Sequence, residues 1–255
     1  MARLASGLGL LRSLVVYHGQ PWRVLPLRRF MRELIEPGAL AFDIGAHAGN
    51  RSLALARAGA RVVALEPQPA FLAVLKRVAS GRTIEVRGEA VGREAGSAIL
   101  RISRRHPTLS SIMPDWPGRI GASPGFERVD WDEEVEVPLV TMDMLIDQYG
   151  RPDFVKIDVE GGEAEVLAGL SHALPLVSFE YLPAAMDVAE RCLDRLAALG
   201  PYDCNLVVGE RQRFHQNGWM PLSEFRAFLL QASRSGASGD VYARLSSSTT
   251  GGAEP

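Results

Sequence analysis

Residues 42–50 read Phe42-Asp43-Ile44-Gly45-Ala46-His47-Ala48-Gly49-Asn50, and this stretch decides the fold. An apolar run over 39–44 predicts a buried strand, and the alanine- and leucine-rich run over 52–58 predicts a helix. The glycines between them let the backbone turn sharply and approach a ligand closely. In an open α/β sheet, such a turn lies at the carboxyl ends of the strands, where ligands bind.

Further apolar runs along the chain have the character of parallel strands. They are short and largely apolar, as expected for strands covered on both faces, and they lie at 61–66, 83–87, 153–159 and 176–181. Predicted helices separate several of them, at 70–79, 163–170 and 184–199. This alternation predicts a doubly wound α/β sheet.

Strand-like runs at 97–103 and 134–140 flank a segment over about 104–135 that is rich in Pro, Gly, Arg, Asp and Trp. We expect an insertion beside the sheet. Its arginines and tryptophans could recognise a sugar or an acidic acceptor, because loops on a fixed scaffold often carry specificity. The segment could equally be a solvated cover for the edge of the sheet.

The chain divides into three predicted parts, which are a helical cap over 1–36, the main α/β domain over 37–245 and a disordered tail over 246–255. The apolar run of the cap, 4–16, is broken by Arg12 and is too short to span a bilayer, so no stable membrane insertion is expected. A last strand near 241–245, after a turn at Gly239-Asp240, is expected to lie antiparallel at the edge of the sheet.

Composition argues against several functions. The 28 basic and 30 acidic residues leave a net charge of −2 and are mixed along the chain, so no nucleic-acid surface is expected. Cys192 and Cys204 are the only cysteines, too few for a disulfide framework or a four-cysteine zinc site, which favours a reducing, cytoplasmic location. The histidines show no metal-ligand spacing, so no metal is expected.

Acids around the first turn indicate the ligand. Asp43 and Glu66 end the first two predicted strands, so both carboxylates should face the same edge of the sheet. Asp43 would repel a pyrophosphate, and the G-x-G-x-x-G spacing of dinucleotide sites is missing. S-adenosylmethionine carries a sulfonium and an ammonium instead of phosphates, and Glu66 could accept hydrogen bonds from its ribose. The alternative is an ordinary tight turn without a ligand.

A second charged group follows at 156–163, Lys-Ile-Asp-Val-Glu-Gly-Gly-Glu. The two-residue period of a strand puts Lys156, Asp158 and Glu160 on one face. Charges inside a central strand are costly unless they are paired or belong to a site. Glu180 ends the next predicted strand at the same edge. These residues form either part of the site or an ion-pair cluster that holds the turn.

These motifs resemble those of the FkbM family of methyltransferases. The resemblance covers about 15–245 and rests on Pro37-Gly38, DIGAHAGN at 43–50, Glu66-Pro67, PLVTMD at 138–143, KIDVEGGE at 156–163 with VLxG at 166–169, and Phe179-Glu180. It implies a class I, Rossmann-like methyltransferase fold: a seven-stranded, mostly parallel sheet with an antiparallel edge strand and helices on both faces. It also implies S-adenosylmethionine as cofactor and O-methylation of a hydroxyl on a small molecule, sugar or glycan.

Predicted site residues follow from the motifs and from the positions they match. The expected cofactor contacts are Asp43, Gly45, Ala46, His47, Gly49, Asn50, Glu66, Pro67, Gln68, Glu89, Ala90 and Asp158. The resemblance implies that Glu89 and Ala90 flank the adenine and that Asp158 lies near the methyl donor. We expect Asp158 or Glu160 to act as the base or to position the acceptor, with Glu180 lining the acceptor pocket.

Two other function classes share part of this pattern. A nicotinamide-dependent oxidoreductase would have the same fold and an acid after the second strand, but it needs a first turn that tolerates phosphate. A non-catalytic binding protein would be expected to have lost one of the acidic strand ends, and none is missing. His18, in the predicted cap, is a rival base to the carboxylates.

Overall fold

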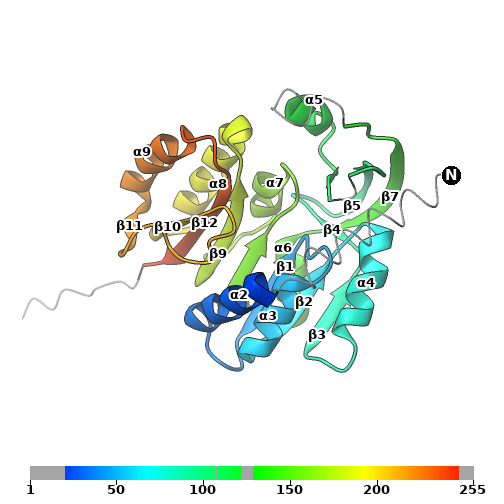
Figure 1. Ribbon diagram of the computed structural model, residues 1–255, viewed down its shortest axis with the longest axis horizontal. Coiled ribbons are helices and arrows are strands. Elements are labelled where there is room, and N and C mark those ends of the chain that lie inside the picture. The colour runs from blue at the N-terminus through cyan, green and yellow to red at the C-terminus, as the bar shows by residue number, and fades with distance from the viewer. Residues whose placement is uncertain (1–20, 107, 122–128, 247–255) are drawn as a thin grey trace, which may run out of the picture.

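The computed structural model describes residues 21–106, 108–121 and 129–246. In this part of the chain, an eight-stranded sheet with the order β11-β10-β12-β9-β8-β1-β2-β3 forms the centre of the molecule (Figure 1). Its strands are β1 (Leu40–Ile44), β2 (Arg61–Leu65), β3 (Ile84–Arg87), β8 (Phe154–Ile157), β9 (Leu176–Tyr181), β10 (Tyr202–Val208), β11 (Met220–Pro221) and β12 (Gly239–Leu245). Strands β3, β2, β1, β8 and β9 run parallel, and β12 runs antiparallel to both its neighbours.

Helices cover both faces of this sheet. One layer comprises α2 (Pro21–Leu34), α3 (Asn50–Ala58) and α4 (Pro69–Ala79), and the other comprises α6 (Met142–Tyr149), α7 (Glu163–Ala168), α8 (Met186–Leu199) and α9 (Leu222–Ser233). The single turn η1 (Pro183–Ala185) precedes α8. Successive residues of β1 alternate between the layers: Ala41 packs with the first and Phe42 with the second, and both are fully buried. This double burial explains why the strands read as continuous apolar runs.

A second, four-stranded sheet lies beside the first. Its order is β4-β7-β5-β6, with strands β4 (Ala90–Val91), β5 (Gly96–Ile102), β6 (Ser110–Ser111) and β7 (Glu133–Val140). The long antiparallel pair β5–β7 flanks the predicted insertion, as expected, and the insertion carries β6 and the short helix α5 (Trp116–Gly121). Leu100, Ile102 and Val137 form a small core of their own within this sheet.

The predicted class I fold is confirmed, with two differences in detail. The main sheet has eight described strands, because the two-residue β11 extends the predicted seven. The last strand, β12, is antiparallel as expected, but it lies between β9 and β10, two positions in from the edge strand β11. The turn predicted at Gly239–Asp240 is wrong, since both residues belong to β12. Gly239 is needed there because a Cβ would lie 2.1 Å from the carbonyl oxygen of Val207.

Several predictions fall on other parts of the chain. The apolar run 4–16, His18 and the tail after 246 lie outside the described residues, and the three-part division of the chain stays a prediction. Among the described helices, none is long and apolar enough to cross a membrane. Cys192 and Cys204 are both buried and unbridged.

Candidate functional site

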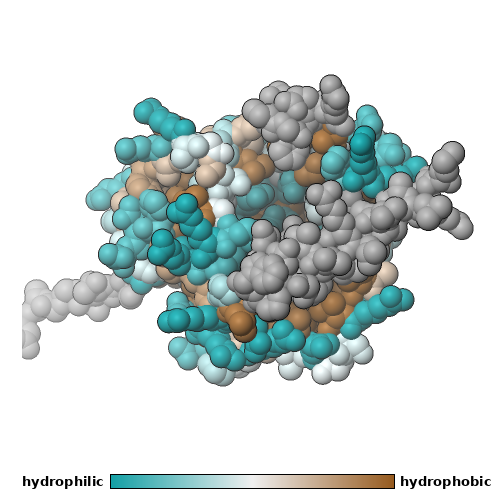
Figure 2. Space-filling view, viewed as in Figure 1, coloured by the Kyte–Doolittle hydropathy of each residue, from teal (hydrophilic) through white to brown (hydrophobic). Residues whose placement is uncertain are grey.

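A cavity of about 270 Å³ opens at the carboxyl ends of β1, β2, β8 and β9. The turns after these strands form its floor, the second sheet contributes one wall, and the loop between β10 and β11 contributes another. Figure 2 shows the molecule hollowed in this region, with hydrophilic side chains visible in the depth. The site therefore lies where a doubly wound sheet places its ligands.

The turn after β1 and the end of β8 are packed directly on each other. Gly45 has φ +81°, and a Cβ on it would lie 1.8 Å from the carbonyl oxygen of Asp158. The N–H of Asp158 donates to the carbonyl of Ile44 at 2.9 Å. Only glycine permits this approach, which brings the two acidic motifs of the sequence to one place.

Asp43 is held from within the protein. Its carboxylate is 2% exposed and accepts a hydrogen bond from the Ser52 hydroxyl on α3. Burial raises the pKa of Asp43, although the Ser52 bond, Arg51 and Lys156 all oppose the rise. Its position on the cavity wall is as predicted, and its contact with a ligand stays a prediction.

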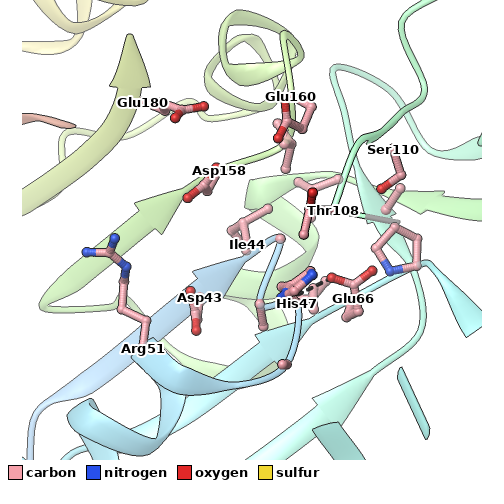
Figure 3. A pocket seen from close by; sticks show the side chains of 18 of the residues that line it. Asp43, Ile44, His47, Arg51, Glu66, Thr108, Ser110, Asp158, Glu160 and Glu180 are labelled. Atoms are coloured by element: carbon pink, nitrogen blue, oxygen red, sulfur yellow. Dashed lines mark hydrogen bonds between the residues drawn. The ribbon is translucent and has the colours of Figure 1, made fainter. Parts of the chain in front are cut away.

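Glu66 is organised by two backbone groups. Its Oε2 accepts the N–H of His47 at 2.7 Å (Figure 3), and its Oε1 accepts the N–H of Gln68 at 2.8 Å. Burial raises the pKa of Glu66 to about 7, against the effect of these two bonds. Each carboxylate oxygen can accept a second hydrogen bond, so a ligand with two hydroxyls could be received here.

A buried charge network lies beneath the second acidic motif. The ammonium of Lys156, which is fully buried, lies 3.4 Å from Oδ2 of Asp158 and 2.7 Å from Oδ1 of Asp240. Arg51, which follows the first turn, lies 3.2 Å from the other oxygen of Asp240. Asp240 is not among the site residues expected from the sequence, because Gly239-Asp240 was predicted to form a turn before the last strand.

Three further acids accompany this network. Burial and the nearby Asp158 raise the pKa of Glu160 to about 8, and the same two causes raise the pKa of Glu180. Glu163 is 3% exposed and accepts the N–H groups of Val159 and Gly161, so it holds the turn at the start of α7. Figure 3 shows Asp158, Glu160 and Glu180 together on the side of the cavity opposite Glu66.

Three large side chains among the described residues of the insertion contact other parts of the protein. Trp116 is 2% exposed and covers Gly161, on which a Cβ would lie 2.2 Å from the indole ring. Arg104 pairs with Glu133, and Arg119 pairs with Asp187. Among its described residues, the insertion reaches the cavity through small polar and apolar side chains, which are Thr108, Ser110, Ser111 and Ile112.

A second wall, which the sequence analysis missed, comes from the loop between β10 and β11. Glu210 and Gln212 line the cavity there. The loop is fixed by buried Asn205, whose Nδ2 donates to the carbonyls of Gln216 and Gly218 at 3.0 and 2.9 Å. No motif in the sequence links this loop to the acidic strand ends, which lie far away along the chain.

Most predicted cofactor residues lie on the cavity wall, and two do not. Those on the wall are Asp43, Gly45, Ala46, His47, Asn50, Glu66, Pro67, Glu89, Ala90 and Asp158, together with Glu160 and Glu180. Gly49 instead faces α4, where a Cβ would lie 2.7 Å from Cδ1 of Leu75. Gln68 acts through its N–H on Glu66. The Glu89 carboxylate is paired with Arg87.

Within the described residues, no three His, Cys, Asp or Glu side chains are grouped to hold a metal ion.

The chain is similar to known methyltransferases. The family model described as the methyltransferase FkbM domain matches residues 43–235. The chain is 29% identical over 212 residues to the hexuronic acid methyltransferase AglP of Haloferax volcanii. The aligned region covers 75% of this chain and 81% of that protein.

Two solved structures are similar in fold. Precorrin-6y C5,15-methyltransferase of Geobacter metallireducens is 13% identical with a TM-score of 0.46, covering 88% of this chain and 87% of that one. An O-methyltransferase of Bacillus cereus in complex with SAH is 12% identical with a TM-score of 0.46, covering 96% and 90%.

Proposed function

The chain belongs to the FkbM methyltransferase family, and from this premise we propose that it methylates a hydroxyl oxygen of a sugar or a sugar-containing acceptor. Its methyl donor is S-adenosylmethionine. The family match gives no support to the nicotinamide-dependent oxidoreductase or to the non-catalytic binding protein. What we propose is the chemical class of the methyl acceptor and the role of each residue in the cavity.

The residues of the cavity fit this cofactor. Glu66 keeps acceptor capacity on both oxygens for the two ribose hydroxyls, since each oxygen receives only one backbone N–H. Asp43 and Asp158 add negative charge on the same wall, which suits a sulfonium and an ammonium and disfavours a pyrophosphate. When bound, the cofactor supplies a methyl group on positively charged sulfur.

The group of carboxylates at the ends of β8 and β9 carries the proposal. A hydroxyl oxygen must lose its proton as it accepts the methyl group, and a carboxylate with a raised pKa is a stronger base than an ordinary one. Glu160, with its pKa of about 8, and Glu180 both meet this condition. Asp158 lies between them and the turn after β1, so we assign to Asp158 or Glu160 the role of base or of positioning the acceptor, and to Glu180 the lining of the acceptor pocket.

The walls of the cavity favour a neutral, hydroxyl-rich acceptor. Thr108 and Ser110 on one wall and Gln212 on the other can exchange hydrogen bonds with sugar hydroxyls. A free carboxylate as the reacting group would be repelled by the carboxylate of Asp158, and Glu160 and Glu180 would add to this repulsion in their ionised forms. The similarity to a hexuronic acid methyltransferase supports a sugar acceptor, and the acidic wall favours its hydroxyl over its carboxylate as the methylated group.

Turnover on a panel of sugars tests the proposal. The protein is incubated with S-adenosylmethionine and matched pairs of glycosides that carry either a neutral hexose or a hexuronic acid. We expect a mass gain of one methylene that survives mild alkali, as a methyl ether does. Methylation that alkali removes would be a carboxylate ester and would contradict the hydroxyl assignment. Methylation of none of these glycosides would contradict the acceptor class.

A further inference from the structure

Asp240 occupies an unusual place for an acid. It lies within β12, between β9 and β10, where it is 8% exposed and opposite Glu180 in the register. One carboxylate oxygen accepts from Lys156 Nζ at 2.7 Å and the other from Arg51 Nη2 at 3.2 Å. A single acid therefore bridges two buried cations from different elements.

The charges in this bridge are permanent near neutral pH. Burial alone would raise the pKa of Asp240, but Lys156 and Arg51 overcome that effect and hold the pKa below its usual value. The pKa of Lys156 is raised by Asp158 and Asp240 despite complete burial, so its ammonium keeps its proton. The only other carboxylate with a described ion pair to Lys156 is Asp158, at 3.4 Å.

The bridge lies beside the cavity. The ionisable groups that face it are Asp43 from β1, Asp158 and Glu160 from the turn after β8, Glu163 from α7, Glu180 and Tyr181 from β9, and Tyr242 from β12. The charge of Lys156 reaches the cavity wall, because its ammonium lies 3.4 Å from Oδ2 of Asp158, which lines the cavity. Removing the negative charge of Asp240 would therefore leave the cavity one unit more positive.

We propose that Asp240 is a positioning residue that neutralises Lys156 and Arg51 beside the cavity and thereby sets the relative affinity of the protein for S-adenosylmethionine and S-adenosylhomocysteine. These two molecules share the adenine, the ribose and the amino-acid group, and they differ in one methyl group and in the positive charge on sulfur. Contacts to the shared groups affect the two affinities equally. The net charge of the cavity affects them differently, because only S-adenosylmethionine carries the positive charge on sulfur. This proposal depends on the binding of S-adenosylmethionine in the cavity and is independent of the sugar acceptor proposed above.

Calorimetry on Asp240→Asn tests this. The substitution keeps the size of the side chain and removes its charge. A unit charge within about 10 Å changes the affinity for a cation by about tenfold at an effective dielectric constant of about 20. We expect binding of S-adenosylmethionine to weaken by about tenfold more than binding of S-adenosylhomocysteine. Equal weakening of both, or no weakening of either, would overturn the proposal.

Two further variants separate charge from structure. Asp203→Asn removes a carboxylate on β10 that pairs with Arg244 at 3.6 Å and does not line the cavity, so the affinity ratio should stay at its wild-type value. The double variant Lys156→Met with Asp240→Asn removes one charge of each sign, and it also serves if the single variant does not fold. We expect it to restore the wild-type ratio, and a ratio that stays shifted would overturn the proposal. Failure of sugar methylation would leave these binding ratios unchanged, so the two proposals fail separately.

Discussion

Replacing Glu66 with glutamine tests the most completely described part of the site. The carboxylate accepts two backbone N–H groups, from His47 and Gln68, one on each oxygen. Glutamine has only one carbonyl oxygen, so one of these N–H groups would face an NH₂ group, and one acceptor for the ribose would be lost. A hydrogen bond to a charged group contributes about 1.5–3 kcal/mol. We therefore expect the affinities for S-adenosylmethionine and S-adenosylhomocysteine to fall together by roughly 10- to 150-fold.

The pH dependence of binding adds a second readout. The pKa of Glu66 is raised to about 7, and its ionised form is the better acceptor for hydroxyl groups. Below that pH the carboxyl group holds a proton that must leave on binding, so the wild-type affinity should fall by up to about tenfold per pH unit as pH decreases. Glu66→Gln has no such proton and should lose this component.

Isothermal calorimetry from about pH 6 to about pH 8 measures both effects. Glu136→Gln is the matched control, because Glu136 is exposed on β7 and its side chain accepts from Ser97 away from the cavity. An affinity of Glu66→Gln within twofold of the wild type, with the same pH profile, would refute the ribose-binding role.

Three other predictions concern the acidic turn and the apo-protein. Asp158→Asn should lower turnover by about 100-fold or more while the protein still binds S-adenosylhomocysteine, and undiminished turnover would remove Asp158 from the reaction. Gly161→Ala should lower the free energy of unfolding by about 1–3 kcal/mol more than Gly81→Ala. Both glycines have positive φ, but only Gly161 is covered by Trp116, so equal losses in denaturant unfolding would contradict that packing. The folded-state pKa values of Glu66 and Glu163, about 7, exceed the ordinary 4.5, so the folded apo-protein holds more protons between these values. Its melting temperature should therefore fall as pH rises from about 5 to about 7, and a rise would show that other groups dominate.

Local motifs account for the part of the site that the sequence predicted. Asp43, Glu66 and Asp158 each end a strand that is recognisable from its own apolar residues, and parallel strands bring their carboxyl ends to one edge. The same reasoning predicts Gly45 in the cofactor turn, and Gly45 lines the cavity. Helix α6 was missed, although Thr141 before it gave a signal, since its side chain accepts the N–H of Met144 as a helix cap.

The remaining site residues depend on topology. Asp240 reaches Lys156 across 84 positions of sequence and Arg51 across 189, and it does so only because β12 inserts between β9 and β10. Gln212 reaches the cavity because its loop follows β10. An antiparallel strand near the end of the chain was predictable from its apolar residues, but its position in the order of strands was not.

A crystal structure with S-adenosylhomocysteine tests the central claim most directly. The account predicts that both ribose hydroxyls donate to Glu66 and that the sulfur lies on the side of the cavity formed by Asp158, Glu160 and Glu180. A nucleoside bound away from Glu66, or a sulfur that faces away from these three carboxylates, would contradict it.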